Sequence, residues 1–519
     1  MPRAFNTTGP CIPGEHYMLP PERRLGRVQE LIAERKYFTL HAGRQTGKTT
    51  SLMWLERHLN ASGHWRALWI DLEMARELPD VAAAMPVILE IFDQALERTH
   101  GALARPDAAE LEAALRQPAT ALARYLGRLA ALDARPLVLL CDEVDGLVGA
   151  AMVSFLTQLR AGYIGRSEAP FPASVVLVGQ RQVRDYVLGA ADRRALSWLG
   201  TTSPFNVTAE ATTLGGFGEA EVAELLGQHT AETGQRFEPG AVRRVWELAQ
   251  GHPWLTSALA GQIVGRDVRD RATAITALHV EAAKEAIILE RRSHIDSLIA
   301  RLGEPRVRRI LEPMLAGTGL PANPIDDDVS YVQGLGLVRV EGGELQIANP
   351  IYREVIPRAL TWTQQIGIHQ PTEWYVRPDG ALDLPALMTA WQAFWRKDGH
   401  LAAEGFDYRE AGPHLMLMAF LQRVVNGGGR IEREYGLGRG ALDLMIFWQE
   451  ARYAVEVKLR RDTETEVEAL EQIARYLDRA GLGEGWLVMF DRRKEPAWAD
   501  KLFLRDVPHA GKTIHIVGC

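Results

Sequence analysis

The ten residues HAGRQTGKTT, His41 to Thr50, constrain the fold of this 519-residue chain more than any other feature of the sequence. They come close to the pattern Gly, any four residues, Gly-Lys-Ser/Thr, which forms a loop that holds phosphate groups. The position of the first glycine carries Ala42, and the nearest glycine, Gly43, stands one place later. Alanine is strained there only if its φ must be positive. The sequence therefore predicts a working loop in which Gly47 has the least freedom to change.

The residues on both sides of the loop have the patterns of a strand and a helix. KYFTLHA (36–42) is a short apolar run, and TTSLMWLERHL (49–59) has apolar residues at helical spacing. In that context the backbone amides and the positive end of the helix hold phosphates. We expect Lys48 to neutralise the β- and γ-phosphates of ATP and the Thr49 hydroxyl to bind Mg²⁺; the alternative is a chance Gly-Lys-Thr on an ordinary turn. The residues expected to contact the nucleotide are Gly43, Arg44, Gln45, Thr46, Gly47, Lys48, Thr49 and Thr50.

An acidic pair follows a second apolar run. In RPLVLLCDEVDGL, the apolar residues from Leu137 end at Cys141 and are followed by Asp142 and Glu143. We expect Asp142 to hold Mg²⁺ through water and Glu143 to polarise the water that attacks ATP. The alternative is helix capping by acidic residues after a strand.

Further apolar runs alternate with helical patterns. WRALWIDLE (65–73) and ASVVLVG (173–179) are typical of buried strands, and the Ala-rich stretch 108–132 is typical of a helix. Alternating strands and helices predict a parallel sheet with ligands at the carboxyl ends of its strands. Gln180 follows one of these strands and is placed to sense the γ-phosphate, with a solvated loop residue as an equal alternative.

Three amphipathic helical patterns between residues 219 and 264 predict a helical lid. With the loop and the acidic pair, residues 5–360 resemble AAA-type ATPases of the archaeal-type and STAND-like branch. The lid of that branch carries a Gly-x-Pro motif that matches Gly251-His252-Pro253. The resemblance implies a P-loop core of the ASCE class and suggests that Pro253 packs near the adenine.

The next segment has the pattern of a winged helix. EPRVRRILEPMLAG (304–317) predicts a helix, and LGLVRVEGGELQIANP predicts a β-hairpin that turns at residues 341–343. Winged helices bind DNA in many proteins and are packing modules in others. We favour packing here, because the basic candidates are few: Arg306, Arg308, Arg309 and Arg339.

A polar, proline-containing stretch, residues 362–383, marks a boundary. Beyond it, RIEREYGLGRGALDLMIFWQEARYAVEVKLRR has the pattern of three strands, and the later run GWLVMFDRR (485–493) has the pattern of a closing strand. Glu456 and Lys458 are two residues apart, so in a strand they point to the same face, while Val455 and Val457 point to the other.

The neighbouring strand carries Asp443, which completes a set suited to hydrolysing a phosphodiester. Asp443, Glu456 and the Val457 carbonyl would bind Mg²⁺, or Mn²⁺ in its place, through oxygen. Lys458 would orient the nucleophile or offset developing charge. The alternative is a salt bridge on a solvated edge strand.

This segment resembles the PD-(D/E)xK nuclease superfamily from about Leu384 onward. Leu442-Asp443 stands where the motif has Pro-Asp, and Glu456-Val457-Lys458 matches its second part. Gln472 and Tyr476 lie four apart on one helical face. They match the Gln-x-x-x-Tyr motif of the RecB and Cas4-like branch, which lies against the active site and the DNA. The resemblance implies a restriction-endonuclease-like domain with DNA as the expected substrate.

Charge does not exclude this interpretation. The formal net charge is −7, but a local basic groove can exist within an acidic total. Glu410 and Glu434 are candidates for a further acidic ligand. The basic residues expected to form a phosphate-binding surface are Arg430, Arg433, Arg439, Lys458, Arg460, Arg461, Arg492, Arg493 and Lys494.

The composition indicates a cytoplasmic protein. The three cysteines lie far apart, and no stretch approaches the roughly 20 apolar residues that a membrane helix needs. The first residues lack the apolar run of a signal peptide. Arg193-Arg194 could serve as an arginine finger in a homo-oligomer, although adjacent arginines are more often solvated.

We therefore expect an α/β multidomain protein with four domains. These are a P-loop ATPase core (1–215), a helical lid (216–290), a winged-helix-like domain (291–365) and a nuclease domain (366–519). The predicted function is an ATP-binding and ATP-hydrolysing switch with a Mg²⁺-dependent nuclease for DNA. The alternative is a STAND-type signalling or scaffold ATPase whose C-terminal domain binds nucleic acid or protein without cutting. A role in bacterial defence or DNA repair is a conjecture from this architecture.

Overall fold

The structure, a computed structural model, falls into two compact units. One contains Met1–His294 and Asn323–Arg339, and the other contains Ile295–Ala322 and Val340–Cys519. The four domains expected from the sequence stay a prediction. The residues that the structure describes are 3–101, 106–179, 208–290, 292–315, 320–323, 325–360, 375–396, 412–425, 429–436, 441–460, 464–491, 493 and 498–519.

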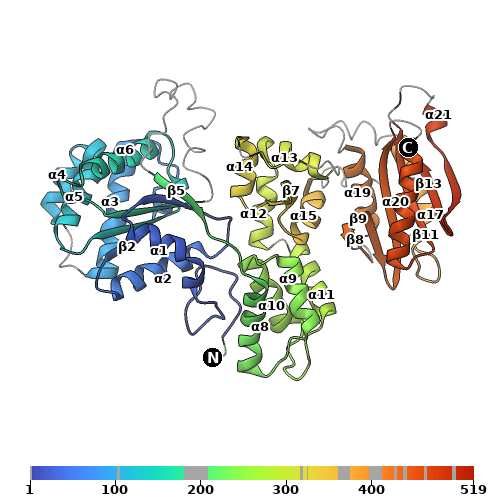
Figure 1. Ribbon diagram of the computed structural model, residues 1–519, viewed down its shortest axis with the longest axis horizontal. Coiled ribbons are helices and arrows are strands. Elements are labelled where there is room, and N and C mark those ends of the chain that lie inside the picture. The colour runs from blue at the N-terminus through green and yellow to red at the C-terminus, as the bar shows by residue number, and fades with distance from the viewer. Residues whose placement is uncertain are drawn as a thin grey trace. The chain divides into compact units, whose positions relative to one another are not determined.

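The first unit is built on a parallel sheet of five strands in the order β2-β3-β4-β1-β5 (Figure 1). Its neighbouring strands all pair in parallel, which confirms the predicted sheet. The central strands β3 and β4 are buried throughout because each is an unbroken apolar run. β5, TAEATT, has no such run, and the sequence does not predict it. The strands are β1 (Tyr37–His41), β2 (Arg66–Asp71), β3 (Leu137–Asp142), β4 (Ser174–Gly179) and β5 (Thr208–Thr213).

Helices cover both faces of this sheet (Figure 1). α1 (Gly26–Ala33) and α2 (Lys48–Ala61) pack on one face. α3 (Val81–His100), α5 (Pro118–Ala131) and α6 (Gly149–Gly165) pack on the other. The single helix predicted over 108–132 is wrong. The stretch forms α4 (Ala108–Leu115) and α5, because Pro118 lacks a backbone N–H and takes the first helical position of α5.

The three helical patterns that predict a lid are present as α8, α9 and α10, and α11 follows them. A sharp turn joins α9 to α10 at Gly251, whose φ is 73°. A Cβ at Gly251 would lie 2.1 Å from the Phe217 carbonyl oxygen, so only glycine fits at the first position of the Gly-x-Pro motif. The bounds are α8 (Glu219–Thr233), α9 (Pro239–Ala249), α10 (Pro253–Gln262) and α11 (Ala277–Leu289).

The predicted hairpin turns at Gly342 and Gly343, where φ is 60° and 85°. Arg308 pairs with the fully buried Glu312 at 2.7 Å, and Arg339 donates to the Gln250 side chain. Both arginines are therefore engaged with side chains of this chain, and the packing role of the segment stays a prediction. The elements here are α12 (Ser293–Arg301), α13 (Pro305–Leu315), α14 (Asp327–Gly334), β6 (Val338–Glu341), β7 (Glu344–Ile347) and α15 (Pro350–Leu360).

The second unit holds a mixed sheet of six strands in the order β12-β13-β11-β10-β9-β8. β8, β9 and β10 form an antiparallel meander, and β11 runs parallel to β10 after the helix α20 (Glu464–Ala480). The sequence predicts β8 to β11 but not the last two strands. The bounds are β8 (Gly429–Gly436), β9 (Ala441–Trp448), β10 (Ala451–Arg460), β11 (Glu484–Asp491), β12 (Leu504–His509) and β13 (Lys512–Gly518).

α20 covers one face of this sheet, where it packs against Met489 and its neighbours (Figure 1). The adjacent residue Phe490 points to the opposite face. There its ring lies 6.1 Å from the ring of Trp391 in α17 (Leu384–Phe394), and Trp391 lies 5.4 Å from Phe420 in α19 (Gly412–Val425). Helices therefore bury both faces. Among the described residues, no helix has the length and apolar character that crossing a membrane requires.

Candidate functional site

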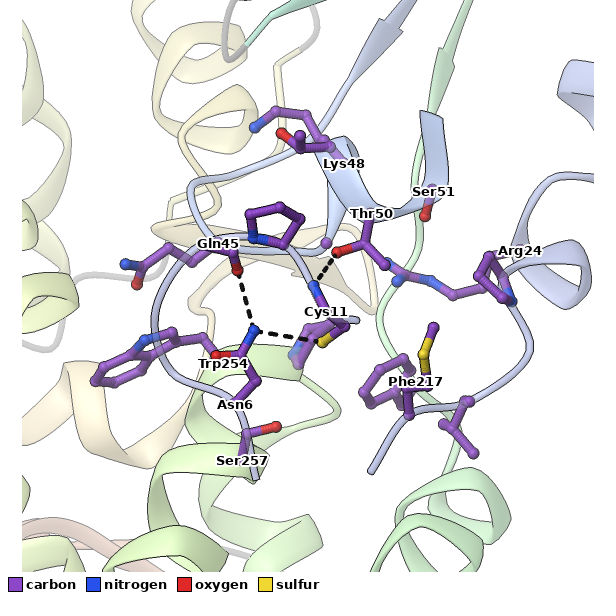
Figure 2. A pocket seen from close by; sticks show the side chains of 18 of the residues that line it. Asn6, Cys11, Arg24, Gln45, Lys48, Thr50, Ser51, Phe217, Trp254 and Ser257 are labelled. Atoms are coloured by element: carbon purple, nitrogen blue, oxygen red, sulfur yellow. Dashed lines mark hydrogen bonds between the residues drawn. The ribbon is translucent and has the colours of Figure 1, made fainter. Parts of the chain in front are cut away.

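A cavity of about 340 Å³ lies at the phosphate-binding loop of the first unit (Figure 2). Glu143, which follows β3, and Pro253, at the start of α10, line it together with most of the loop. Gly43, Thr46 and Asp142 are not in its wall, and Gln180 lies outside the described residues. The loop residues in the wall are Arg44, Gln45, Gly47, Lys48, Thr49 and Thr50.

The backbone of the loop explains how alanine is tolerated at its start. Within the loop, positive φ values occur at Gln45 (57°) and Gly47 (85°), and Ala42 is not among the described residues with a positive φ. Ala42 is therefore unstrained, whereas Gly47 adopts the left-handed conformation that favours glycine. Gly43 has a different constraint, because a Cβ there would lie 3.0 Å from the Leu335 carbonyl oxygen.

Lys48 lies across the loop. Its Nζ donates to the carbonyls of Ala42 and Gly43, at 3.1 Å each, and the side chain is 7% exposed. Burial lowers the pKa of Lys48, while the nearby carboxylates of Asp142 and Glu143 oppose that change. The ammonium is thus held beside the cavity by weak neutral acceptors, which an anionic phosphate would outcompete.

Thr49 and Asp142 meet at the carboxyl ends of β1 and β3. The Thr49 hydroxyl donates to Asp142 Oδ2 at 2.8 Å, and burial raises the pKa of this carboxyl group. A hydroxyl and a carboxylate side by side are oxygen ligands of the kind that Mg²⁺ takes. Glu143 stands next with a φ of 51°, and burial followed by the charge of Asp145 raises its pKa to about 7.

The segment ahead of α1 forms a large part of the cavity wall, a role that is not predicted from the sequence. Cys11 N donates to the Thr50 hydroxyl at 2.9 Å, as Figure 2 shows. Arg24 donates to the carbonyls of Thr46 at 3.0 Å and Gly215 at 2.8 Å, and burial lowers its pKa to about 10. The other wall residues from this segment are Asn6, Thr7, Gly9, Pro10, Tyr17, Met18, Leu19, Pro20 and Pro21.

One regular pattern in α8 could have indicated this role. Glu224, Gln228 and Glu232 are spaced four apart and share a helical face. Glu224 accepts from Arg23 at 2.6 Å, Gln228 Nε2 donates to the Met18 carbonyl at 2.9 Å, and Glu232 accepts from Arg3 at 2.7 Å. This face therefore attaches the N-terminal segment to the lid.

The second unit brings together the residues expected at a nuclease site. Asp443 Oδ2 accepts from Val457 N at 2.8 Å, and Asp443 N lies 3.4 Å from Glu456 Oε2, to which it donates. Lys458 Nζ is 2.8 Å from Glu456 Oε1. Glu456 and Lys458 point to the face that α20 covers, since Ala454 of the same strand belongs to the α20 core.

Burial and nearby charges shift the pKa values of Glu456 and Lys458. Glu456 is fully buried, and burial together with the nearby charge of Asp443 raises its pKa to about 7. Burial alone would lower the pKa of Lys458, but attraction to Glu456 and Asp443 raises it instead. Perturbed groups of this kind are frequent at functional sites, although structural ion pairs also produce them.

The two α20 residues of the predicted motif lie against this group. Gln472 Nε2 donates to the Tyr476 hydroxyl at 3.2 Å, and Tyr476 is close enough to Lys458 to contribute to raising its pKa. Within the described residues, no three side chains of the His, Cys, Asp and Glu types form a group that could hold a metal ion. In the described part of the chain, the donors at this group are two carboxylates and backbone oxygen.

Much of the predicted basic surface falls outside the described residues or side chains. Arg460 lies 3.6 Å from Glu466, and Arg493 lies 2.6 Å from Asp491, so carboxylates already neutralise these two cations. The predicted residues whose side chains are not described are Glu410, Arg430, Arg433, Glu434, Arg439, Arg461, Arg492 and Lys494, together with Arg193 and Arg194.

No protein-family model and no curated protein matches the chain. Among solved structures, the Walker-type ATPase PABY2304 of Pyrococcus abyssi is similar, with 14% identity and a TM-score of 0.47 over 68% of this chain and 99% of that chain. ORC1 of Aeropyrum pernix in complex with DNA shows 16% identity and a TM-score of 0.34 over 69% and 96%. Cdc6p of Pyrobaculum aerophilum shows 15% identity and a TM-score of 0.36 over 67% and 95%.

In the sheet, β4 lies between β1, which precedes the phosphate-binding loop, and β3, which precedes the acidic residue Glu143. The loop itself leads from β1 into α2, and the acidic pair stands where β3 ends. Together these features give the first unit the fold of a P-loop nucleotide-binding core.

Proposed function

We propose that the chain is an ATP-binding and ATP-hydrolysing switch whose second unit is a metal-dependent nuclease, with DNA as its substrate. The observation that carries the nuclease proposal is the contact of Asp443, Glu456 and Lys458 on one face of the sheet. A solvated salt bridge, the alternative, would leave both partners exposed. Glu456 is instead fully buried, and a buried carboxylate is costly unless it has a use or a close partner.

The topology of the second unit supports the same proposal. The chain runs through α19, the meander β8-β9-β10, the helix α20 and the parallel strand β11. This is the order that the resemblance to the PD-(D/E)xK superfamily implies.

The donor set fits a hard divalent cation. Asp443 and Glu456 would hold it with the Val457 carbonyl, because the N–H and C=O of one strand residue point to the same edge and Val457 N–H faces Asp443. Bound Mg²⁺ would supply the Lewis acidity for phosphodiester hydrolysis. Lys458 would offset the charge that develops on the phosphate, and Tyr476 beside it would keep that ammonium in place.

In the first unit, the loop amides and Lys48 would bind the β- and γ-phosphates, and Thr49 with Asp142 would hold Mg²⁺. Glu143 lines the cavity and would orient the attacking water and accept its proton. The base and ribose would lie between the N-terminal segment and Pro253.

The switch is supported by a contact of the loop itself. Gly43 packs on the backbone of Leu335 and Gly336, at the turn that leads from α14 into β6. The chain, which has already contributed Ile295–Ala322 to the second unit, passes into it again at Val340. A change in the loop on binding ATP would therefore reach the segment that connects the units, which can bias their arrangement.

A cleavage panel tests the proposal. Single- and double-stranded DNA and RNA are incubated with Mg²⁺ or Mn²⁺, with and without ATP, using the wild type, Lys48→Ala and Lys458→Ala. We expect metal-dependent cleavage that Lys458→Ala abolishes and that ATP alters only when Lys48 is present. Cleavage unaffected by ATP and by Lys48→Ala would remove the switch. Absence of cleavage under every condition would favour the scaffold ATPase.

A further inference from the structure

His252, the middle residue of the Gly-x-Pro motif, joins the lid to the phosphate-binding loop. It is the N-cap of α10, where its Nδ1 accepts from Leu255 N at 3.4 Å. The same ring hydrogen-bonds to the backbone of Arg44 in the loop. One side chain thus contacts two elements that both line the nucleotide cavity.

The bond to Arg44 raises the pKa of His252, so it favours the protonated ring, which is the effect of a ring N–H that donates to a backbone carbonyl. Nδ1 accepts from Leu255 N, so a neutral ring that keeps this bond carries its proton on Nε2 and would donate to the Arg44 carbonyl from there. A protonated ring could keep the bond to Arg44 but would lose the cap, because Nδ1 would no longer accept.

The surroundings keep His252 neutral and in place. Burial lowers the pKa of His252 to about 4. The ring of His294 lies 4.7 Å from it and is itself stacked at 4.9 Å on Trp254, a residue of the cavity wall. The position of the imidazole is therefore determined by packing as well as by hydrogen bonds.

The bond to Arg44 has a consequence for the loop. In a trans peptide the C=O and the following N–H point in opposite directions. Holding the Arg44 carbonyl toward His252 therefore turns the Gln45 N–H away from the lid residue. Gln45 has a φ of 57°, which a residue with a side chain adopts only at a cost, so contacts from outside the loop help to keep this conformation. Arg24 makes one such contact at the Thr46 carbonyl, and His252 makes another at Arg44.

We propose that His252 is a positioning residue that presets the phosphate-binding loop by holding the Arg44 carbonyl, so that the Gln45 N–H is available to a nucleotide phosphate before the nucleotide arrives. The inference rests on the proposed ATP site. It adds a residue that increases the affinity for a nucleotide through the interaction of the loop with the phosphates. Its effect is exerted through the loop, since His252 itself lies outside the wall of the cavity.

Two substitutions separate the two bonds of the ring. His252→Asn keeps an acceptor close to the position of Nδ1 and remains a good N-cap, but it cannot reach Arg44. His252→Gln extends a donor amide toward the position of Nε2 but caps poorly. Affinities for Mg·ADP and for adenosine are measured by isothermal titration calorimetry, with the melting temperature as a check on folding.

For the wild type we expect binding of both ligands. His252→Asn should bind ADP about tenfold more weakly, because it loses the hydrogen bond to Arg44 that helps to keep the strained loop backbone in place. Its affinity for adenosine and its melting temperature should not change. His252→Gln should retain most of the ADP affinity at a lower melting temperature. If His252→Asn binds ADP as tightly as the wild type, or loses ADP and adenosine equally, the positioning role is wrong. A wild type that binds neither ligand would overturn the ATP site itself.

Discussion

Lowering the pH should destabilise the first unit through His252. Burial is the main reason that its pKa is lowered to about 4, and the nearby cations Arg24 and Lys48 act in the same direction, while the bond to Arg44 opposes them. His294, the adjacent ring, also has a pKa well below its usual value, because of burial. An unfolded histidine titrates near pH ~6.5. Between these two pKa values the unfolded state holds a proton that the folded state does not, so stability falls as the pH falls through ~6.5.

The loss of folding stability can be worked out from the pH range between the folded and unfolded pKa values of His252. From pH ~6.5 to pH ~5 the His252 contribution is about 1.4 kcal/mol per pH unit, which gives about 2 kcal/mol between pH ~8 and pH ~5. At about 2–4 °C per kcal/mol, the melting temperature should fall by roughly 4–8 °C from this residue.

The assay is thermal unfolding of the wild type and His252→Asn across the same pH range. It is carried out at high ionic strength, which screens the interactions between surface charges. Asparagine does not titrate, so the wild type should lose several degrees more than the variant. Titrating groups distant from this position cancel in the comparison, whereas His252 itself helps to lower the pKa of His294, which therefore changes with the substitution. An equal pH dependence in the two proteins would refute the assignment of a buried neutral imidazole at this position.

Three further outcomes follow from the geometry. Gly251→Ala should destabilise the first unit by at least about 1–2 kcal/mol, because alanine is strained at a positive φ and its Cβ would meet the Phe217 carbonyl; a melting temperature like that of the wild type would contradict this. Thr49→Ala should lose the Mg²⁺-dependent part of ATP affinity, whereas Thr49→Ser, which keeps the hydroxyl, should not; titrations with and without EDTA measure it. Tyr476→Phe removes the hydroxyl that accepts from Gln472, so cleavage should slow with little change in melting temperature, and an unchanged rate would count against this residue.

The parts of the fold that follow from local patterns are predictable from the sequence. Unbroken apolar runs identify β3 and β4, and the carboxyl ends of parallel strands meet at one edge, which is why Thr49 and Asp142 could be placed together from the sequence. The period of two along a strand likewise places Glu456 and Lys458 on one face.

Features that depend on contacts between distant segments are not predictable in this way. The segment that contains Cys11 and Arg24 forms part of the cavity wall through hydrogen bonds to α2, to the residues after β5 and to α8. Its own sequence has no periodic pattern that predicts these contacts. β5 pairs at the edge of the sheet without an apolar run, because backbone hydrogen bonds to β1 suffice. The roles of His252 depend on ring geometry, which a Gly-x-Pro pattern does not specify.

We propose that the half-buried Asp443 and the buried Glu456 of the second unit hold a metal ion with which the protein cleaves nucleic acid. The most direct test is the rate of DNA cleavage in Mg²⁺ by the wild type and by Glu456→Gln, a substitution that keeps the shape and removes the charge. We expect cleavage by the wild type, none after EDTA treatment, recovery when Mg²⁺ is restored, and a loss of at least about a hundredfold in the variant, the scale on which a single catalytic group acts. Cleavage at the wild-type rate by Glu456→Gln, or in the presence of EDTA, would show that these carboxylates hold no catalytic metal ion.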